Sequence, residues 1–266
     1  MGDYKYIGYK GTTKKYGDFE VLSYEGKGCY KVTFPATGYE VISSSKEIVS
    51  GNIKDLLYPI VLGVGCVGLG VYKCAGESRS NTPEYEVWRG ILRRCHDKNS
   101  TSYARYGMRG VTIQSNWYNF QNFAEWYTRQ PAYFKRWHLD KDLVDYNALE
   151  YNTVNCTLVP PAINSLFTGG FKTIVPFIKG KGKWVVQIQI GEKCFNGNKR
   201  QSYFGDYSDQ QEALDAYFKH KIAHVKDVAS RYKDDLDERV FANLNNDQWI
   251  KDYIYHLSTL TNKETI

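Results

Sequence analysis

Two short apolar runs in the last third of the chain carry the residues best suited to bind another molecule. In the run 184–190, Trp184, Val186 and Ile188 share one side, because side chains alternate across a strand. The opposite side of this run and of the next one, 201–204, is polar and free of acids. Its candidate contacts are Lys183, Gln187, Gln189, Gln201 and Tyr203. Gln suits base edges and Lys suits phosphates, so this face predicts a nucleic-acid contact.

Positive charge is concentrated around the same runs. Between Lys172 and Lys233 there are 12 Lys and Arg against 6 Asp and Glu, an excess equal to the net charge of +6 of the whole chain. Further candidate DNA contacts beside the runs are Lys179, Lys181, Lys199 and Arg200. A localised basic patch is typical of a protein that binds a polyanion. Charge alone fits an ordinary solvated face equally well, and the missing acids favour DNA.

Three strands and one helix must hold this face in place. The strands are predicted at 174–178, 184–190 and 201–204. The helix begins at the capping pattern Ser208–Gln211 and continues to about Tyr232, with an apolar stripe that covers the inner side of the sheet. We therefore expect Trp184 in the core and Phe204 facing the helix. A final helix is predicted over 234–260.

Three segments of this region match a known pattern: 183–188 (Lys-Trp-Val-Val-Gln-Ile), 203–207 (Tyr-Phe-Gly-Asp-Tyr) and 212–217 (Glu-Ala-Leu-Asp-Ala-Tyr). Over roughly residues 172–230 the chain resembles the plant ethylene-response-factor DNA-binding domain, and phage-encoded homing endonucleases carry similar domains. The resemblance implies that the outward sheet residues enter the major groove of double-stranded DNA. Gln and Lys stand here where that family mostly has Arg, so no particular target sequence is implied.

A second basic segment lies upstream. The helix predicted from Pro83 has a buried stripe made of Trp88, Ile91, Leu92 and Cys95. Arg89, Arg93 and Arg94 lie off that stripe and face solvent or phosphate. Arg109 follows in a glycine turn that enters a strand, and it is a candidate either for a phosphate contact or for a structural hydrogen bond.

Four segments of the middle part match a second pattern: 88–95, 106–111, 139–142 and 155–160. They resemble phage HNH (His-Me finger) endonucleases, and the N-terminal segments 54–59 and 63–65 are similar to the N-terminal β-module of such proteins. The similarity therefore extends over nearly the full length. The residues themselves, from Trp137 on, predict a strand, a polar loop, a second strand and a short helix.

The resemblance also implies an active site. In HNH enzymes a histidine activates water, and a divalent metal, Mg²⁺ or Mn²⁺, stabilises the leaving oxygen. In the family register Lys141 stands in the place of that histidine, and His138 lies three residues earlier. The implied catalytic candidates are His138, Asp140, Lys141 and Asn155, and the implied metal ligands are Asp140, Asp142 and Asn164. The alternatives are an exposed strand position for His138 and turn or capping duty for Asn155 and Asn164.

The expected fold class is α+β, with three small modules. They are an N-terminal β-rich module at 1–76, an HNH-like ββα domain at 82–168, and a three-stranded sheet with its helices at 169–266. The polar segment 75–83 is a predicted linker. The glycine-rich run 63–70 lacks the Gly-Lys-Ser/Thr ending of a phosphate loop, so we predict a tightly packed connection instead.

Composition points to a cytoplasmic protein without a membrane contact. No apolar run approaches the ~18 residues of a membrane span, and the first residues do not form a secretion signal. The six cysteines are scattered without a C-x-x-C pair, which fits a reducing compartment.

The leading functional expectation is an HNH-type homing endonuclease that cleaves double-stranded DNA with a divalent metal. The rival is a catalytically inactive relative that acts as a DNA-binding regulator or inhibits a host factor. Lys141 distinguishes these two functions, because a lysine in place of the histidine argues against hydrolysis unless His138 or another base substitutes for it.

Overall fold

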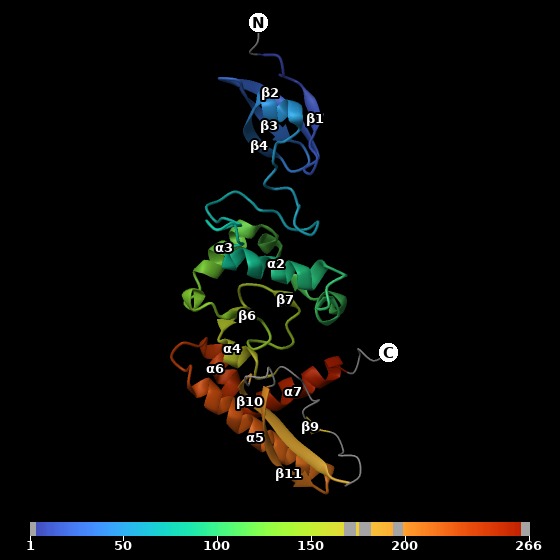
Figure 1. The fold of residues 1–266 in the computed structure, drawn as a ribbon, viewed down its shortest axis with the longest axis vertical. Coiled ribbons are helices and arrows are strands. Elements are labelled where there is room, and N and C mark those ends of the chain that lie inside the picture. Colours follow the sequence, from blue (N-terminus) through green and yellow to red (C-terminus); the bar gives the residue numbers. More distant parts are fainter. Residues whose placement is uncertain (1–3, 168–173, 176–181, 194–198, 262–266) are drawn as a thin grey trace. The chain divides into compact units, whose positions relative to one another are not determined.

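The computed structural model describes residues 4–167, 174–175, 182–193 and 199–261. Helices and antiparallel sheets are both present, which confirms the α+β class. The chain divides into two compact units, Met1–Thr128 and Arg129–Ile266 (Figure 1). The boundary falls inside the range 82–168, and the division into three modules stays a prediction. Among the helices of the described ranges, none has the length and apolar character needed to cross a membrane.

The first unit begins with an antiparallel sheet in the order β1-β2-β3-β4. Its elements are β1 (Lys10–Thr12), β2 (Asp18–Gly26), β3 (Cys29–Phe34), β4 (Tyr39–Ser44) and α1 (Ser45–Ser50). β3 and β4 pair on either side of the turn at residues 35–38. In β3, Tyr30, Val32 and Phe34 are buried on one face, as the alternation of apolar residues requires. Ser44 and Glu47 form a capping box that starts α1.

The first unit continues with helices and short turns. They are α2 (Pro83–His96), η1 (Tyr103–Arg105), η2 (Gly107–Arg109), β5 (Thr112–Ile113), η3 (Ser115–Tyr118) and α3 (Phe120–Thr128). The predicted stripe of α2 is confirmed: Trp88, Ile91, Leu92 and Cys95 are all buried. The Trp88 indole Nε1–H donates to the Trp117 carbonyl over 2.7 Å, so this large side chain is buried with its polar group satisfied.

The glycine-rich run is a tightly packed connection, as predicted. A Cβ on Gly65 would lie 2.7 Å from Leu92 Cδ1 and 2.8 Å from Trp88 Cζ2, so only glycine fits against α2. The side-chain amide of Gln121 donates to the carbonyls of Val67 and Tyr72. This stretch of chain is therefore held by α2 and α3 without forming a helix or a strand of its own.

The second unit contains an antiparallel pair, a three-stranded sheet and three longer helices. Its elements are η4 (Tyr133–Lys135), β6 (His138–Asp140), β7 (Glu150–Tyr151), β8 (Thr157–Val159), α4 (Pro161–Asn164), β9 (Ile174–Val175), β10 (Trp184–Lys193), β11 (Lys199–Tyr207), α5 (Gln210–Ser230), α6 (Glu238–Asn245) and α7 (Asp247–Thr261). β6 pairs with β8, and the larger sheet has the antiparallel order β11-β10-β9. The succession of β6, β8 and α4 along the chain confirms the predicted strand–loop–strand–helix unit. The order β11-β10-β9 confirms the predicted three-stranded sheet.

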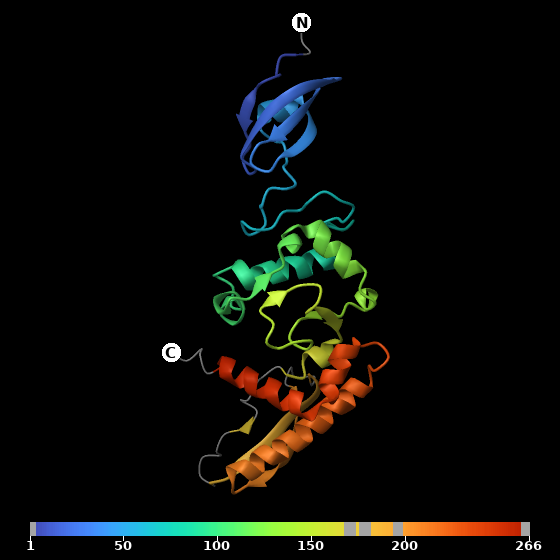
Figure 2. The same cartoon turned by 180° about the vertical axis from the view of Figure 1, so that it is seen from behind.

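α5 lies along the β10–β11 pair, and Figure 2 shows α6 and α7 folding back from its far end. The single helix predicted over 234–260 is wrong, because Asn246 separates α6 from α7. Its backbone is extended, and its side-chain oxygen accepts from the backbone N–H groups of Gln248 and Trp249. Asparagine is a favoured N-cap residue, and here it starts a new helix.

Trp184 is a second correction. We expected it in the core, and its side chain is partly exposed, whereas Val185 from the opposite face is buried. Trp184 is the first residue of β10 and pairs with Tyr207, the last residue of β11. A side chain at the end of a strand pair has neighbours on fewer sides than one in its middle, so alternation alone overestimates its burial.

Candidate functional site

Gln187 and Tyr203 form the centre of the polar sheet face. They stand directly opposite each other in the β10–β11 register, and directly opposed residues lie on the same face of a sheet. On the other face Val186 is fully buried, and the Phe204 ring stacks on His220 of α5 with centroids 4.1 Å apart. Tyr203 is 59% exposed. The predicted division between an inner and an outer face is confirmed at these positions.

The outer face carries an acid, contrary to our expectation. Simple alternation turns Asp206 inward together with Phe204, but a β-bulge in β11 shifts the phase, since the register slips between Val186 and Gln187. Gly205 at the bulge has φ of 133°, a conformation that glycine adopts readily. Asp206 is exposed and accepts a hydrogen bond from the Tyr203 hydroxyl, which raises the pKa of Tyr203.

The remaining predicted DNA contacts of this region divide into three groups. Lys183 is exposed just before β10. Lys179 and Lys181 lie outside the described residues. For the other four, the structure gives the strand backbone and the side chains lie outside the description: Gln189, Lys199, Arg200 and Gln201.

His138 and Asn164 are brought together by the β6–β8 pair and α4. His138 is exposed at the start of β6, and its Nδ1 lies 3.0 Å from Asn164 Nδ2. With the amide NH₂ donating, Nδ1 accepts, and a neutral imidazole then carries its proton on Nε2. This tautomer donates to an incoming oxygen. A reversed amide would instead accept from Nδ1–H and leave Nε2 as a base.

Lys141, one of the predicted catalytic candidates, is a buried cation with a structural role. Its side chain is 5% exposed, and Nζ donates to Asp142 Oδ1 at 2.5 Å and to the Ala148 carbonyl at 2.8 Å. The ammonium also lies 5.9 Å from the centre of the Tyr151 ring. An ammonium has donors only, and these are directed at fixed acceptors within the loop. The side chain therefore ties the loop after β6 together.

Asp140 is a partly buried carboxyl group with a perturbed affinity for protons. Its Oδ1 accepts from the Leu143 backbone N–H at 2.8 Å. Loss of surrounding water raises the pKa of Asp140 to about 6, and the nearby Asp142 carboxylate adds to the rise. Cys156 is buried close by, and burial raises the pKa of its thiol to about 12. A thiol of this kind is not a nucleophile.

Each of the three predicted metal ligands has a polar contact in the structure. Asp140 Oδ1 accepts from Leu143, Asp142 Oδ1 binds Lys141, and Asn164 contacts His138 through Nδ2, while the second carboxylate oxygens and Asn164 Oδ1 take no part in these contacts. The described ranges hold no group of three or more His, Cys, Asp or Glu side chains that could bind a metal. A hard cation needs several oxygen ligands directed at one point.

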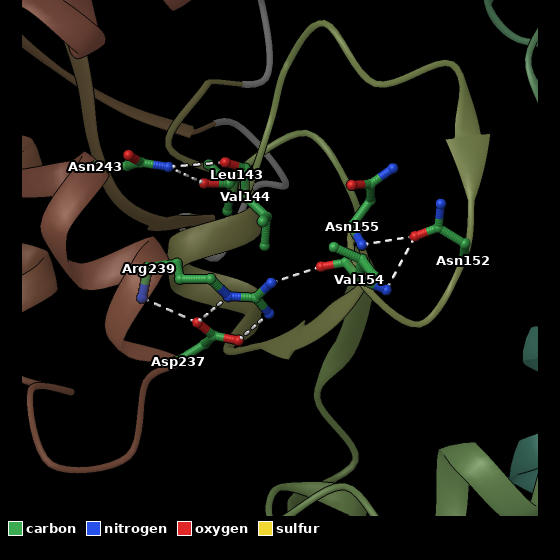
Figure 3. A network of polar contacts seen from close by, with 8 residues as sticks. All are labelled: Leu143, Val144, Asn152, Val154, Asn155, Asp237, Arg239 and Asn243. Carbon is green, nitrogen blue, oxygen red and sulfur yellow. Dashed lines mark hydrogen bonds and ion pairs between the residues drawn. The ribbon is translucent and has the colours of Figure 1, made fainter.

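Asn155 lies in a turn that α6 clamps (Figure 3). Its backbone N–H, like that of Val154, donates to Asn152 Oδ1, at 2.7 and 3.0 Å respectively. Arg239 of α6 donates from Nη1 to the Val154 carbonyl at 2.6 Å, and its other nitrogens bind Asp237. This arrangement gives Asn155 the turn position that was its alternative assignment.

A second part of the clamp holds the loop after β6. Asn243 donates from Nδ2 to the carbonyls of Leu143 and Val144, at 2.9 and 3.0 Å (Figure 3). Sequence reasoning missed Asn243 and Arg239, since both sit in an ordinary amphipathic helix and belong to no motif. Their partners are backbone carbonyls 85 and 100 residues away, which no local pattern signals.

Arg109 belongs to the first unit and makes a structural hydrogen bond. Its Nη1 donates to the Arg105 carbonyl at 3.2 Å, while the residue remains exposed. Because a guanidinium has five N–H donors, one such bond leaves others available for phosphate. Both assignments considered for Arg109 are therefore compatible with its geometry.

Comparisons with protein-family models, with curated proteins and with solved structures found no match to this chain.

Proposed function

We propose that the protein binds double-stranded DNA through the outer face of β10 and β11. The observation that carries the proposal is the cross-strand pair Gln187–Tyr203, which faces away from α5, and the exposed Lys183 directly precedes the same strand. A two-stranded antiparallel ribbon fits the major groove of B-DNA. Gln can form two hydrogen bonds with adenine in the major groove, to N6 and N7, and Lys neutralises phosphate.

Asp206 has a place in this proposal. A carboxylate on a DNA-facing surface is repelled by phosphates, but it can accept from the N4 amino group of cytosine. Its hydrogen bond with Tyr203 orients both side chains on the exposed end of the ribbon. The proposed base contacts are therefore Gln187, Tyr203 and Asp206, and Lys183 is the proposed phosphate contact.

Sequence discrimination tests the proposal. Duplexes selected from a random pool with the full chain supply a preferred site, and affinities for this site and for a scrambled duplex are then compared. Gln187→Ala should reduce the ratio of the two affinities by about 1–3 kcal/mol, or roughly 5- to 150-fold. Gln210→Ala is the control, because Gln210 is an exposed glutamine at the start of α5. Unchanged discrimination in Gln187→Ala would remove the proposal's main support.

A second candidate function, DNA cleavage, is favoured by one observation, the contact of His138 with Asn164. An exposed imidazole held by an amide can take part in phosphodiester hydrolysis. We rank it below DNA binding without cleavage, since Lys141 donates to Asp142 and to the Ala148 carbonyl within the loop and so does not act as a base.

Plasmid nicking with Mg²⁺ or Mn²⁺ separates the two candidates. Binding without cleavage predicts no nicking that depends on His138. Nicking that disappears in both His138→Ala and Asp140→Ala, with DNA affinity retained, would establish the second candidate instead. Nicking that persists in both variants would place the reaction elsewhere in the chain.

A further inference from the structure

The first unit carries a basic surface of its own, centred on the second half of α2. Between residues 87 and 118 the sequence has six Lys and Arg against one acid, Asp97. We use the name α2 arginine surface for the exposed members of this group and the partly buried Arg94: Arg89, Arg93, Arg94, Lys98, Arg105 and Arg109.

The arginines of α2 and those of η1 and η2 belong to elements that pack tightly against one another. η1 and η2 fold against the last turns of α2, where a Cβ on Gly107 would lie 2.3 Å from the Cys95 carbonyl oxygen. The Arg94 guanidinium lies 5.6 Å from the centre of the Tyr106 ring, between η1 and η2. Arg105 and Arg109 therefore lie in turns that pack against the C-terminal end of α2, the end that carries Arg93 and Arg94.

Most of these charges have no acidic partner. Within the described part of the chain, no carboxylate forms an ion pair with Arg89, Arg93, Arg105 or Arg109. Arg89 instead lies over the Tyr85 ring, at 5.8 Å from its centre. Ordinary solvated surfaces intersperse both signs of charge, and a single-sign patch raises the electrostatic repulsion within the folded protein.

The helix dipole accounts for part of the pattern only. Cations in the last turn of a helix are stabilised by the carbonyl ends, which explains Arg93 and Arg94. The dipole effect falls off within one turn, so it does not extend to Arg89 in mid-helix or to Arg105 and Arg109 beyond the helix. A polyanionic partner accounts for all of them.

We infer that the α2 arginine surface is a second DNA-binding surface, which contacts the phosphate backbone of duplex DNA. Guanidinium groups form bidentate hydrogen bonds with phosphate, and arginines on a helix and an adjacent turn can bind successive phosphates. The inference shares the DNA partner with the proposed function but uses a different unit and a different kind of contact. The sheet reads bases, and this surface supplies affinity that does not depend on sequence.

The salt dependence of binding by the full chain tests this inference. Each phosphate contact contributes about 0.9 to the slope of log K against log salt, so Arg93→Gln/Arg105→Gln should lower the slope by about 2 and weaken binding roughly 60-fold near 0.1 M salt. Within the described chain, neither side chain makes a hydrogen bond, an ion pair or a ring contact that the substitution would break. Lys46→Gln/Lys54→Gln removes the same charge from exposed positions elsewhere in the unit and should leave the slope nearly unchanged.

Two further variants complete the experiment: a conservative double change on the α2 arginine surface and the Gln187→Ala change in the sheet. Arg93→Lys/Arg105→Lys keeps both charges and should restore most of the slope, since lysine binds phosphate as a point charge. An unchanged slope in Arg93→Gln/Arg105→Gln, with discrimination lost in Gln187→Ala, overturns this inference and leaves the proposed function intact. The reverse pattern overturns the proposed function alone, and a wild-type chain without salt-sensitive DNA binding overturns both.

Discussion

Asn243 offers the sharpest test of how α6 holds the loops around His138. Its amide donates two hydrogen bonds, to the carbonyls of Leu143 and Val144. Asn243→Ala removes both N–H donors, so the partly buried carbonyls of Leu143 and Val144 must be hydrated instead. A net contribution of roughly 1 kcal/mol for each bond gives an expected loss of about 2 kcal/mol in the free energy of unfolding.

Asn245→Ala is the matched control for this prediction. Asn245 lies on the same helix, is exposed, and donates only to the Phe241 carbonyl of its own helix. Urea denaturation gives the free energies, and amide hydrogen exchange over residues 139–150 locates the effect. Equal losses in the two variants, or unchanged exchange in the loop after β6, would refute the idea that α6 clamps this loop.

Three further predictions concern other parts of the chain. Lys141→Ala should destabilise the second unit by about 1–3 kcal/mol, because it leaves the buried Ala148 carbonyl without its donor and the partly exposed Asp142 without its counter-ion; an unchanged free energy of unfolding in urea would contradict this. A raised acid pKa means that stability present at low pH is lost as pH rises, so Asp140→Asn should remove a decline of at most about 3 kcal/mol between about pH 4 and pH 6; equal pH profiles of wild type and variant would exclude it. Gly65→Ala should cost about 1–3 kcal/mol through overpacking against Trp88, whereas Gly90→Ala, with open space at its Cβ, should stabilise α2 by about 0.5–1 kcal/mol; thermal melts that place both variants on the same side of wild type would rule this out.

Local patterns predicted the elements whose partners are close in sequence. The alternation in β3 and the stripe of α2 depend on side-chain periodicity alone, and both were confirmed by burial. The single final helix was wrong, since periodicity continues across Asn246 while a capping side chain interrupts the backbone. The acid-free sheet face was wrong for a similar reason: one bulged residue at Gly205 reverses the phase that alternation assumes.

The candidate site was predicted less completely than the fold. The sequence placed His138 and Asn164 in one hairpin unit, and the structure brings their side chains into contact. It did not indicate that Lys141 is buried with its charge paired inside the loop, because that depends on the closure of residues 141–148. Contacts such as those of Asn243 depend on tertiary packing and have no signature in sequence.

The attachment of the glycine-rich run to α3 bears on the order in which the first unit folds. Gln121 bonds to Val67 and Tyr72 across 54 and 49 residues, and the segment 65–72 forms no helix or strand of its own. Closing so large a loop costs entropy before any of these bonds can form. We therefore expect the segment around residues 65–72 to become ordered late, after α2 and α3 have packed. During synthesis it would leave the ribosome well before the residues that hold it, and it would stay accessible to proteases for that interval.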